Sequence, residues 1–353
     1  MRGPIKPPSH FDRLVLRLRE HSVTRGGGHV SADSGFRNRR ILFQIAALGI
    51  SCVAALAAAS LRLPSEGDLS VPQAIEAAAA SAEKEMSQAE SFLKREKIAA
   101  GIPVDAFSRG LIGDEYNDLT TTLGSLSAKR TAENPLWASV LVKRLWLAGL
   151  RKGDLITAGM SGSFPGLNLA LALACKNLDL RLAAISSVTA STHGANQPGF
   201  TWPEMESMLV AQGYFRAVSV GIAAGGAGDV AADLQPEGRA LATAIAERSA
   251  TALGARLLAP ANEREAAANR VSLYRDIAQG KRVALYVNIG GTEASLGSSA
   301  AVLELSSGFL PAIPFDLSET RGVMAMMMEA GVPVLSLLNI RDLALKWGVS
   351  IEE

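Results

Sequence analysis

The sequence predicts an α/β protein with a doubly wound, mostly parallel sheet behind a single N-terminal transmembrane helix. Three observations support this fold class. From residue 135 onward, short apolar runs alternate with helical patterns. The apolar runs are continuous, as expected for strands of a parallel sheet covered on both faces. Near the N-terminus, an uncharged apolar stretch is long enough, as a helix, to cross a bilayer.

The N-terminal part of the chain is predicted to anchor the protein in the inner (cytoplasmic) membrane. Residues 1–40 form a basic arm, and residues 41–62 form the transmembrane helix. Arg39 and Arg40 precede this helix directly, and basic residues beside a span stay on the cytoplasmic side. The arm is therefore expected to be cytoplasmic, and the chain that follows the span is expected to be extracytoplasmic.

Two other interpretations of the apolar stretch stay open. It is a cleavable signal if Ala57 and Ala59 belong to a cleavage site, or a buried helix of the core. Residues 63–101 are predicted to form a linker and an Ala-rich helix, which either lifts the domain off the membrane or packs on its flank. Residues 102–353 then form the extracytoplasmic α/β domain.

The elements of the domain follow from hydrophobic periodicity and from glycine and proline at their ends. The Ala-rich helix covers 73–101 and stops before Pro103. Further helices are expected at 135–150, 167–177, 204–212, 238–253, 270–279, 321–330 and 341–347, and strands at 154–160, 181–187, 215–224, 282–288 and 332–338.

Composition excludes several classes of function. The formal net charge of +1 gives no indication of a nucleic-acid partner. The two cysteines are Cys52, inside the predicted span, and Cys175, so the domain has no internal disulfide and no cysteine-based zinc site. No His or carboxylate cluster has the spacing of metal ligands, and neither a metal nor a cofactor is expected.

Three loops rich in small residues follow predicted strands, so we expect them to share one site at the carboxyl edge of the sheet. In the first, Gly159–Ser163 resembles the nucleophile elbow G-x-S-x-G, with Ser163 in place of the last glycine. Ser161 or Ser163 would be the nucleophile, and N–H groups around Gly162 would bind an anion or oxyanion. A tight corner in which either serine caps a helix is the alternative.

The second loop holds Asn288, Gly290, Gly291 and Thr292, whose backbone could form a nest for a carboxylate. A plain turn is the alternative interpretation. The third loop, residues 226–231, fits the dinucleotide fingerprint G-x-G-x-x-A, which is a weak signal alone. An extracytoplasmic location argues against a nucleotide ligand.

Two residues are candidate bases for a serine nucleophile. His193 is the only histidine beyond the predicted span, in a loop after a strand. Lys129 lies in a hydroxyl-rich segment, and burial could lower its pKa. Lys129 and Arg130 equally suit the binding of carboxylates. Candidate orienting carboxylates are Glu133, Asp229, Glu293 and Asp316.

Four segments of the chain carry a family resemblance: GLIGDEYNDLTTTLGSLSAKRTAENPLWASV, GMSGSFPGLNLA, GANQPGFTWPEME and VNIGGTEASLG. With these segments in this order, the chain from Ile102 onward resembles the poly-gamma-glutamate system protein family of bacteria. The family's elements correspond here to Thr120–Thr122 (with Thr121 and Thr122 as binding candidates), Lys129–Arg130, Ser161–Ser163 and Asn288–Gly291. His193 matches no element of the family.

The resemblance implies a membrane-anchored component of a poly-gamma-glutamate synthesis and export system, whose partners are the polymer or its glutamyl ends and the synthase subunits. In one hypothesis Ser161 or Ser163 attacks a γ-amide, and Lys129 or His193 takes the proton. In the other, the protein is a non-catalytic accessory subunit. A Rossmann oxidoreductase is a third hypothesis. The sequence leaves open whether the protein is an enzyme.

Overall fold

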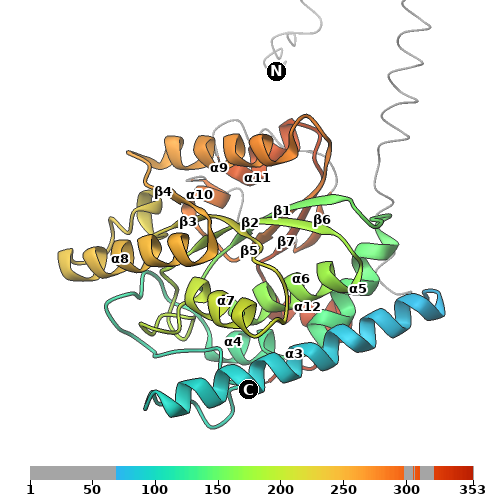
Figure 1. Ribbon diagram of the computed structural model, residues 1–353, viewed down its shortest axis with the longest axis horizontal. Coiled ribbons are helices and arrows are strands. Elements are labelled where there is room, and N and C mark those ends of the chain that lie inside the picture. The colour runs from blue at the N-terminus through green and yellow to red at the C-terminus, as the bar shows by residue number, and fades with distance from the viewer. Residues whose placement is uncertain (1–68, 298–304, 306, 311–321, 353) are drawn as a thin grey trace, which may run out of the picture. The chain divides into compact units, whose positions relative to one another are not determined.

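The computed structural model describes residues 69–297, 305, 307–310 and 322–352. Within them, the chain forms a seven-stranded sheet in the order β4-β3-β2-β1-β5-β7-β6 (Figure 1). All neighbouring strands are parallel except β6, which pairs with β7 in the antiparallel sense. The predicted α/β class with a mostly parallel sheet is confirmed.

The predicted arm and transmembrane helix, residues 1–62, lie outside the described residues. None of the helices that the structure describes is both long and apolar enough to cross a membrane.

Most of the strands lie where apolar runs predict them. The strands are β1 (Leu155–Met160), β2 (Arg181–Ser187), β3 (Ser219–Ala223), β4 (Arg256–Leu258), β5 (Val283–Ile289), β6 (Gly308–Leu310) and β7 (Val334–Leu337). The central strand β1 is buried throughout, as expected for a parallel sheet covered on both faces. Sequence analysis misses β4 and β6, because three residues are too few to show a period.

Helices cover both faces of the sheet, with α9 and α11 on one side and α5, α6 and α7 on the other (Figure 1). The helices are α3 (Gln73–Ala99), α4 (Leu126–Ala132), α5 (Leu136–Leu147), α6 (Pro165–Asn177), α7 (Trp202–Ala211), α8 (Pro236–Leu253), α9 (Glu263–Ala278), α10 (Glu293–Leu296), α11 (Val323–Glu329) and α12 (Ile340–Trp347), with a 3₁₀ turn η1 (Ala227–Asp229). Helix α9 begins earlier than predicted because the Asn262 side chain caps it, accepting the Glu265 N–H.

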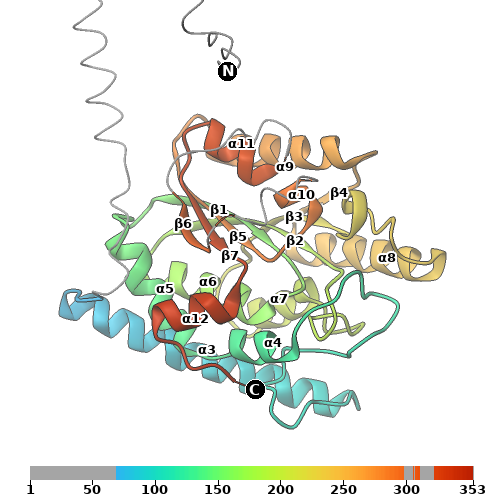
Figure 2. The same ribbon diagram turned by 180° about the vertical axis from the view of Figure 1, so that it is seen from behind.

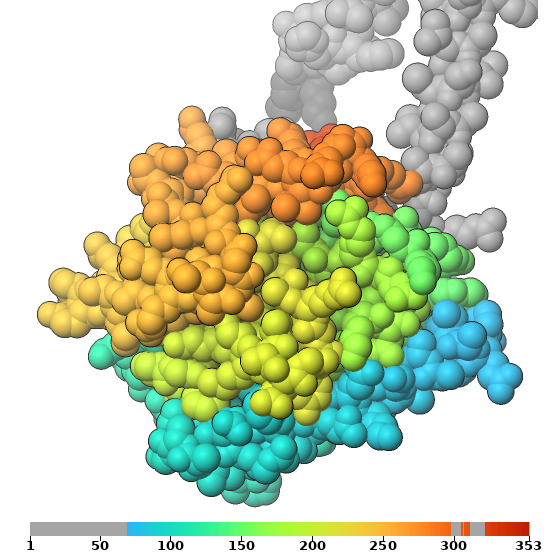
Figure 3. Space-filling model, in the orientation of Figure 1, coloured from blue at the N-terminus to red at the C-terminus, as the bar shows by residue number. Residues whose placement is uncertain are grey.

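The Ala-rich helix α3 packs on the flank of the domain, one of its two expected positions. It lies along α5 and α6, and Figure 3 shows its blue to cyan surface against the rest of the body. Ala82, Met86 and Leu93 are buried in the same core as those two helices. Helix α3 is therefore part of the core of the domain.

The order of the strands places a topological switch point between β1 and β5. From β1 the chain builds outward through β2, β3 and β4, and then returns to add β5 on the other side of β1. The loops that follow β1 and β5 meet at this point, where the Ser161 N–H donates to the Ile289 carbonyl at 3.2 Å. In doubly wound sheets, ligands bind outside the carboxyl ends of the strands at such a point.

The short helix α4 is held in place by the C-terminal segment. After α12 the chain runs back to α4, as Figure 2 shows. There the Ser127 hydroxyl donates to the Glu352 carbonyl at 2.8 Å, and the Glu352 N–H donates to the Thr131 hydroxyl at 3.0 Å. These contacts fix the helix that carries Lys129.

Candidate functional site

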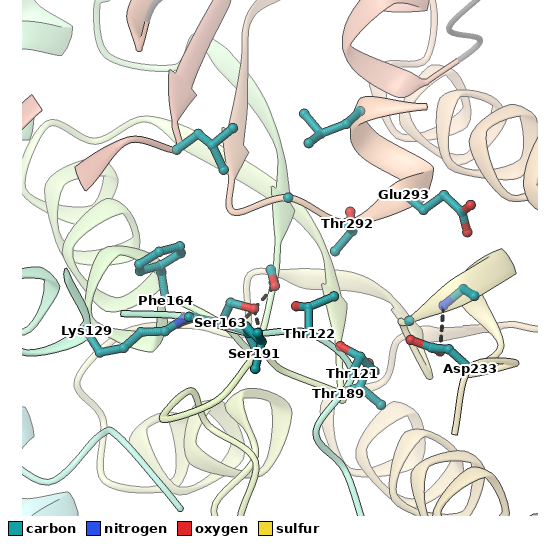
Figure 4. Close-up of a pocket in the computed structure, with 18 of the residues that line it drawn as sticks. Thr121, Thr122, Lys129, Ser163, Phe164, Thr189, Ser191, Asp233, Thr292 and Glu293 are labelled. Carbon is teal, nitrogen blue, oxygen red and sulfur yellow. Dashed lines mark hydrogen bonds between the residues drawn. The ribbon is translucent and has the colours of Figure 1, made fainter. Parts of the chain in front are cut away.

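A cavity of about 660 Å³ lies at the carboxyl edge of the sheet, at the switch point. The segment before α4 and the loops that follow β1, β2, β3, β5 and β7 contribute to its wall. Its lining includes Thr121, Thr122, Leu123 and Gly124 before α4, Ser161, Ser163 and Phe164 after β1, Thr189 and Ser191 after β2, Gly226, Ala227 and Asp233 after β3, and Gly291, Thr292 and Glu293 after β5 (Figure 4). The expectation that the three loops rich in small residues meet at one site is therefore confirmed.

Lys129 reaches this cavity from α4, and its side chain is only 1% exposed. Its Nζ lies 2.6 Å from the Ser191 Oγ and 2.5 Å from the Ser163 carbonyl oxygen. The centre of the Phe164 ring is 4.0 Å away. Among the described residues no carboxylate forms an ion pair with it, and burial lowers its pKa to about 7. Near neutral pH a large fraction of this amine is therefore uncharged.

Ser191 is the serine whose hydroxyl meets the Lys129 amine, and it is 5% exposed. Its N–H donates to the Ser163 hydroxyl at 3.0 Å, which fixes its loop against the loop that follows β1. On the other side it lies against Gly124, where an added Cβ would come within 2.9 Å of the Ser191 Oγ. A larger residue at 124 would require the serine hydroxyl or the Lys129 side chain to shift.

The two serines expected to act as nucleophiles line the cavity without contacting the amine through their hydroxyls. The Ser161 hydroxyl accepts the Ser163 N–H at 3.1 Å, and the Ser163 hydroxyl accepts the Ser191 N–H. Ser161 is not among the residues with positive φ, so the loop lacks that kind of backbone strain at the serine. The Ser161 hydroxyl thus stabilises the turn after β1, and the Ser163 hydroxyl joins this turn to the loop after β2.

His193 and Arg130 do not line the cavity. The His193 imidazole makes no hydrogen bond to any residue that the structure describes. Two nitrogens of the Arg130 guanidinium donate to Asp105 at 2.8 and 3.0 Å, and the group lies over the Phe107 ring. Neighbouring positions of a helix point about 100° apart, so Lys129 faces inward where Arg130 faces the Asp105 loop.

The other predicted binding residues divide into two groups. Thr121, Thr122, Gly291 and Thr292 line the cavity. The N–H groups of Gly291 and Thr292 donate to no residue that the structure describes.

The second group shapes the loops behind the cavity wall. Gly290 packs against Ser161, since an added Cβ there would lie 2.9 Å from the Ser161 Cβ. Asn288 is fully buried, and its Nδ2 donates to the Gly290 carbonyl at 2.9 Å. The Gly162 carbonyl accepts the Ala195 N–H.

The loop with the dinucleotide fingerprint does not open a long helix. It contains the 3₁₀ turn η1, and α8 begins only at Pro236. Asp229 in this turn forms a fully buried, two-pronged ion pair with Arg270, at 2.7 and 2.8 Å. The strand–turn–helix context that the fingerprint requires is absent from this loop.

Sequence analysis does not single out Ser191 and Thr189, although both belong to the loop that holds His193. The signal available was the hydroxyl-rich run SSVTAST, residues 186–192, directly at the end of β2. A serine that follows a central parallel strand is well placed for ligand binding, whether or not a histidine lies nearby.

Comparison of the chain with protein-family models, with curated proteins and with solved structures found no match. Among the residues that the structure describes, no group of three or more His, Cys, Asp or Glu side chains could hold a metal ion.

Proposed function

We propose that this chain is a serine–lysine acyl hydrolase or transferase that acts on amide bonds. One observation carries the proposal: the Lys129 amine, buried and with a pKa of about 7, lies 2.6 Å from the Ser191 Oγ in the wall of a cavity. An amine with a lowered pKa beside a hydroxyl is the arrangement by which lysine activates a serine nucleophile.

The neighbours of the amine support this role. In the uncharged amine, one N–H donates to the Ser163 carbonyl and a second faces the Phe164 ring, which leaves the lone pair for the Ser191 hydroxyl proton. The Ser191 Oγ forms a bond to the substrate's carbonyl carbon, and its proton passes to Nζ. The C–N bond then breaks, and Nζ returns the proton to the leaving amine. Water hydrolyses the acyl-enzyme, or a second amine takes the acyl group.

The γ-glutamyl amides of poly-gamma-glutamate are the substrate that the sequence resemblance implies. The charges of the cavity favour an end of this polymer over its middle. Lys129 is the only basic side chain in the described lining, which also includes Asp233 and Glu293. Because Arg130 is paired with Asp105 outside the cavity, a long run of substrate carboxylates would find few cations. Anchoring by residues 41–62 and an extracytoplasmic location stay part of this proposal.

The experiment compares Ser191→Ala with Ser161→Ala in the full-length protein. Poly-gamma-glutamate and γ-glutamyl oligomers are incubated with each variant, and released amine and chain length are measured. We expect Ser191→Ala to lower turnover by at least about 10³-fold and Ser161→Ala by no more than about tenfold. Equal turnover by the wild type and Ser191→Ala contradicts the proposal, and the absence of turnover in both would favour the non-catalytic accessory role instead.

A further inference from the structure

Four large apolar side chains line the cavity that holds the serine–lysine pair. Leu123 precedes α4, Phe164 follows β1, Leu296 ends α10, and Leu338 follows β7. These segments are far apart in the sequence, and three of them meet because the carboxyl ends of parallel strands share one edge of the sheet. The cavity therefore has an apolar part in addition to its hydroxyl-lined part.

Three of the four side chains surround one short stretch of backbone, Gly290–Gly291. A Cβ added at Gly291 would lie 3.4 Å from the Leu296 Cδ1 and 3.6 Å from the Leu338 Cδ1. A Cβ added at Gly290 would lie 3.5 Å from the Phe164 Cδ2. The two distances at Gly291 are those of ordinary apolar contacts. The space beside Gly291 thus accommodates a methyl group in contact with both leucines.

This apolar part adjoins the groups that are proposed to react. The centre of the Phe164 ring is 4.0 Å from the Lys129 Nζ, and Figure 4 shows the ring beside the lysine side chain. Leu123 is bonded to Gly124, where an added Cβ would lie 2.9 Å from the Ser191 Oγ. A ligand group that contacts Leu123 and Phe164 therefore lies close to the bond that the serine attacks.

Leu123 indicates what kind of group this is. Its side chain is 90% exposed although it lines the cavity. Contact with an alkyl chain removes this apolar surface from water, which is favourable. A charged group in the same place loses its water and gains no partner from leucine or phenylalanine side chains, which is unfavourable. This part of the cavity therefore selects an alkyl group over a charged one.

We propose that Leu123, Phe164, Leu296 and Leu338 form a subsite for an alkyl chain on the acyl side of the scissile amide. The inference rests on the proposed function for the reaction and for this choice of side. In a γ-glutamyl amide the acyl side presents two methylenes next to the carbonyl, whereas the amine side presents a carboxylate. The subsite extends the substrate class to amino acids acylated with longer alkyl chains, which should bind more tightly than short-chain ones.

The test measures binding to the full-length Ser191→Ala protein, in which the probe is not consumed. N-acetylglutamate and N-hexanoylglutamate, both made from racemic glutamate, are titrated in a calorimeter. They share the amide and the glutamate and differ by four methylenes. We expect the hexanoyl probe to bind at least about tenfold more tightly, because part of its chain leaves water.

Two further substitutions, each added to Ser191→Ala, locate the alkyl chain. Leu123→Ser should reduce the preference for the hexanoyl probe by about threefold, and folding should tolerate it because the side chain is exposed. Gly291→Ala should weaken the hexanoyl probe by about threefold to tenfold, since its methyl occupies the space between the two leucines. Gly291 is not among the glycines with positive φ, so alanine fits its backbone.

Leu345→Ser is the matched control, since Leu345 in α12 is 72% exposed and does not line the cavity. It should retain the full preference. Equal affinity for both probes, absence of binding of either, a preference that survives both Leu123→Ser and Gly291→Ala, or an equal loss in Leu345→Ser overturns the subsite. These outcomes are independent of the turnover assay, in which full activity of Ser191→Ala would overturn the proposed function alone.

Discussion

The domain buries two lysines, Lys97 in α3 and Lys129 in α4. Comparing them distinguishes a lysine that stabilises the structure from a lysine placed to act as a base. Burial lowers both pKa values, to about 8 for Lys97 and about 7 for Lys129. The Lys97 Nζ donates to the Ile112 carbonyl at 2.7 Å, and nearby carboxylates partly restore its pKa. Lys97 does not line the cavity, whereas Lys129 lines it and contacts the Ser191 hydroxyl. A lowered pKa identifies a candidate base only together with a reactive partner and space for a substrate.

The surroundings of Lys97 explain what that lysine does. Its acceptor, Ile112, belongs to a loop that the buried Glu133 carboxylate also holds, by accepting three backbone N–H groups and the Ser108 hydroxyl. Burial raises the pKa of Glu133, and these hydrogen bonds oppose the rise. Further along, the same loop carries Thr121 to Gly124 into the cavity. Lys97 thus supports one wall of the site without facing it.

Replacing each lysine by methionine gives the largest expected contrast. Lys129→Met removes the base, and we expect turnover to fall by about 10²–10⁴-fold, the usual contribution of general base catalysis. Lys97→Met keeps the cavity lining intact, so turnover per folded molecule should stay within about threefold of the wild type. Steady-state kinetics on the folded fraction, determined from urea unfolding, provides the measurement. A loss in Lys97→Met as large as in Lys129→Met would remove the distinction between the two lysines.

The fold is largely predictable from the sequence, because the buried strands of a parallel sheet leave continuous apolar runs. β1, β2 and β5 are found within one residue at each end. The meeting of the three loops also follows, since the carboxyl ends of parallel strands share one edge. Helix α4 is not predictable in the same way, because seven residues between a serine cap and Glu133 hold too few apolar positions to show a period.

The chemistry of the site is harder to predict, since it depends on contacts between distant segments. Lys129 and Ser191 are 62 positions apart in the chain, and no local pattern connects them. In the sequence, the adjacent residues Lys129 and Arg130 indicate one cationic patch. Only the packing of α4 shows that the two side chains face different surroundings. Ser161 matches most of a known motif, but its hydroxyl is engaged with the Ser163 N–H.

The pH dependence of turnover sharpens the comparison further. Lys129 must be uncharged to accept a proton, so turnover should rise with pH through about 7, by about tenfold per pH unit below that value. The pKa of Lys97, about 8, should leave no second rise in the profile. The measurement is kcat/KM from pH 5 to 9 for the wild type and for Lys97→Met. A midpoint of the pH profile that shifts in Lys97→Met would show that Lys97, and not Lys129, controls turnover.

The pH dependence of the free energy of unfolding is a second way to follow the titration of Lys129. The folded-state pKa of Lys129, about 7, lies below its ordinary value of 10.5, so between these values the unfolded chain binds more protons than the folded one. The contribution of Lys129 to the free energy of unfolding therefore rises with pH across this window. The wild type should gain stability relative to Lys129→Met from pH 7 to 10.

The smallest expected effect concerns two glycines of the loop that joins the two lysine environments. At Gly124 an added Cβ would lie 2.9 Å from the Ser191 Oγ and 3.0 Å from the Lys129 Cε, so Gly124→Ala must displace one of them by a few tenths of an ångström. We expect turnover to fall by about tenfold, since catalysis is sensitive to such shifts. At Gly113, next to the Lys97 acceptor, the Cβ would instead overlap the Asn196 side chain and the Gly194 carbonyl. Gly113→Ala should therefore lower the free energy of unfolding and leave turnover per folded molecule nearly unchanged. An equal loss of turnover in both variants would instead show that the loop acts on the site as one unit.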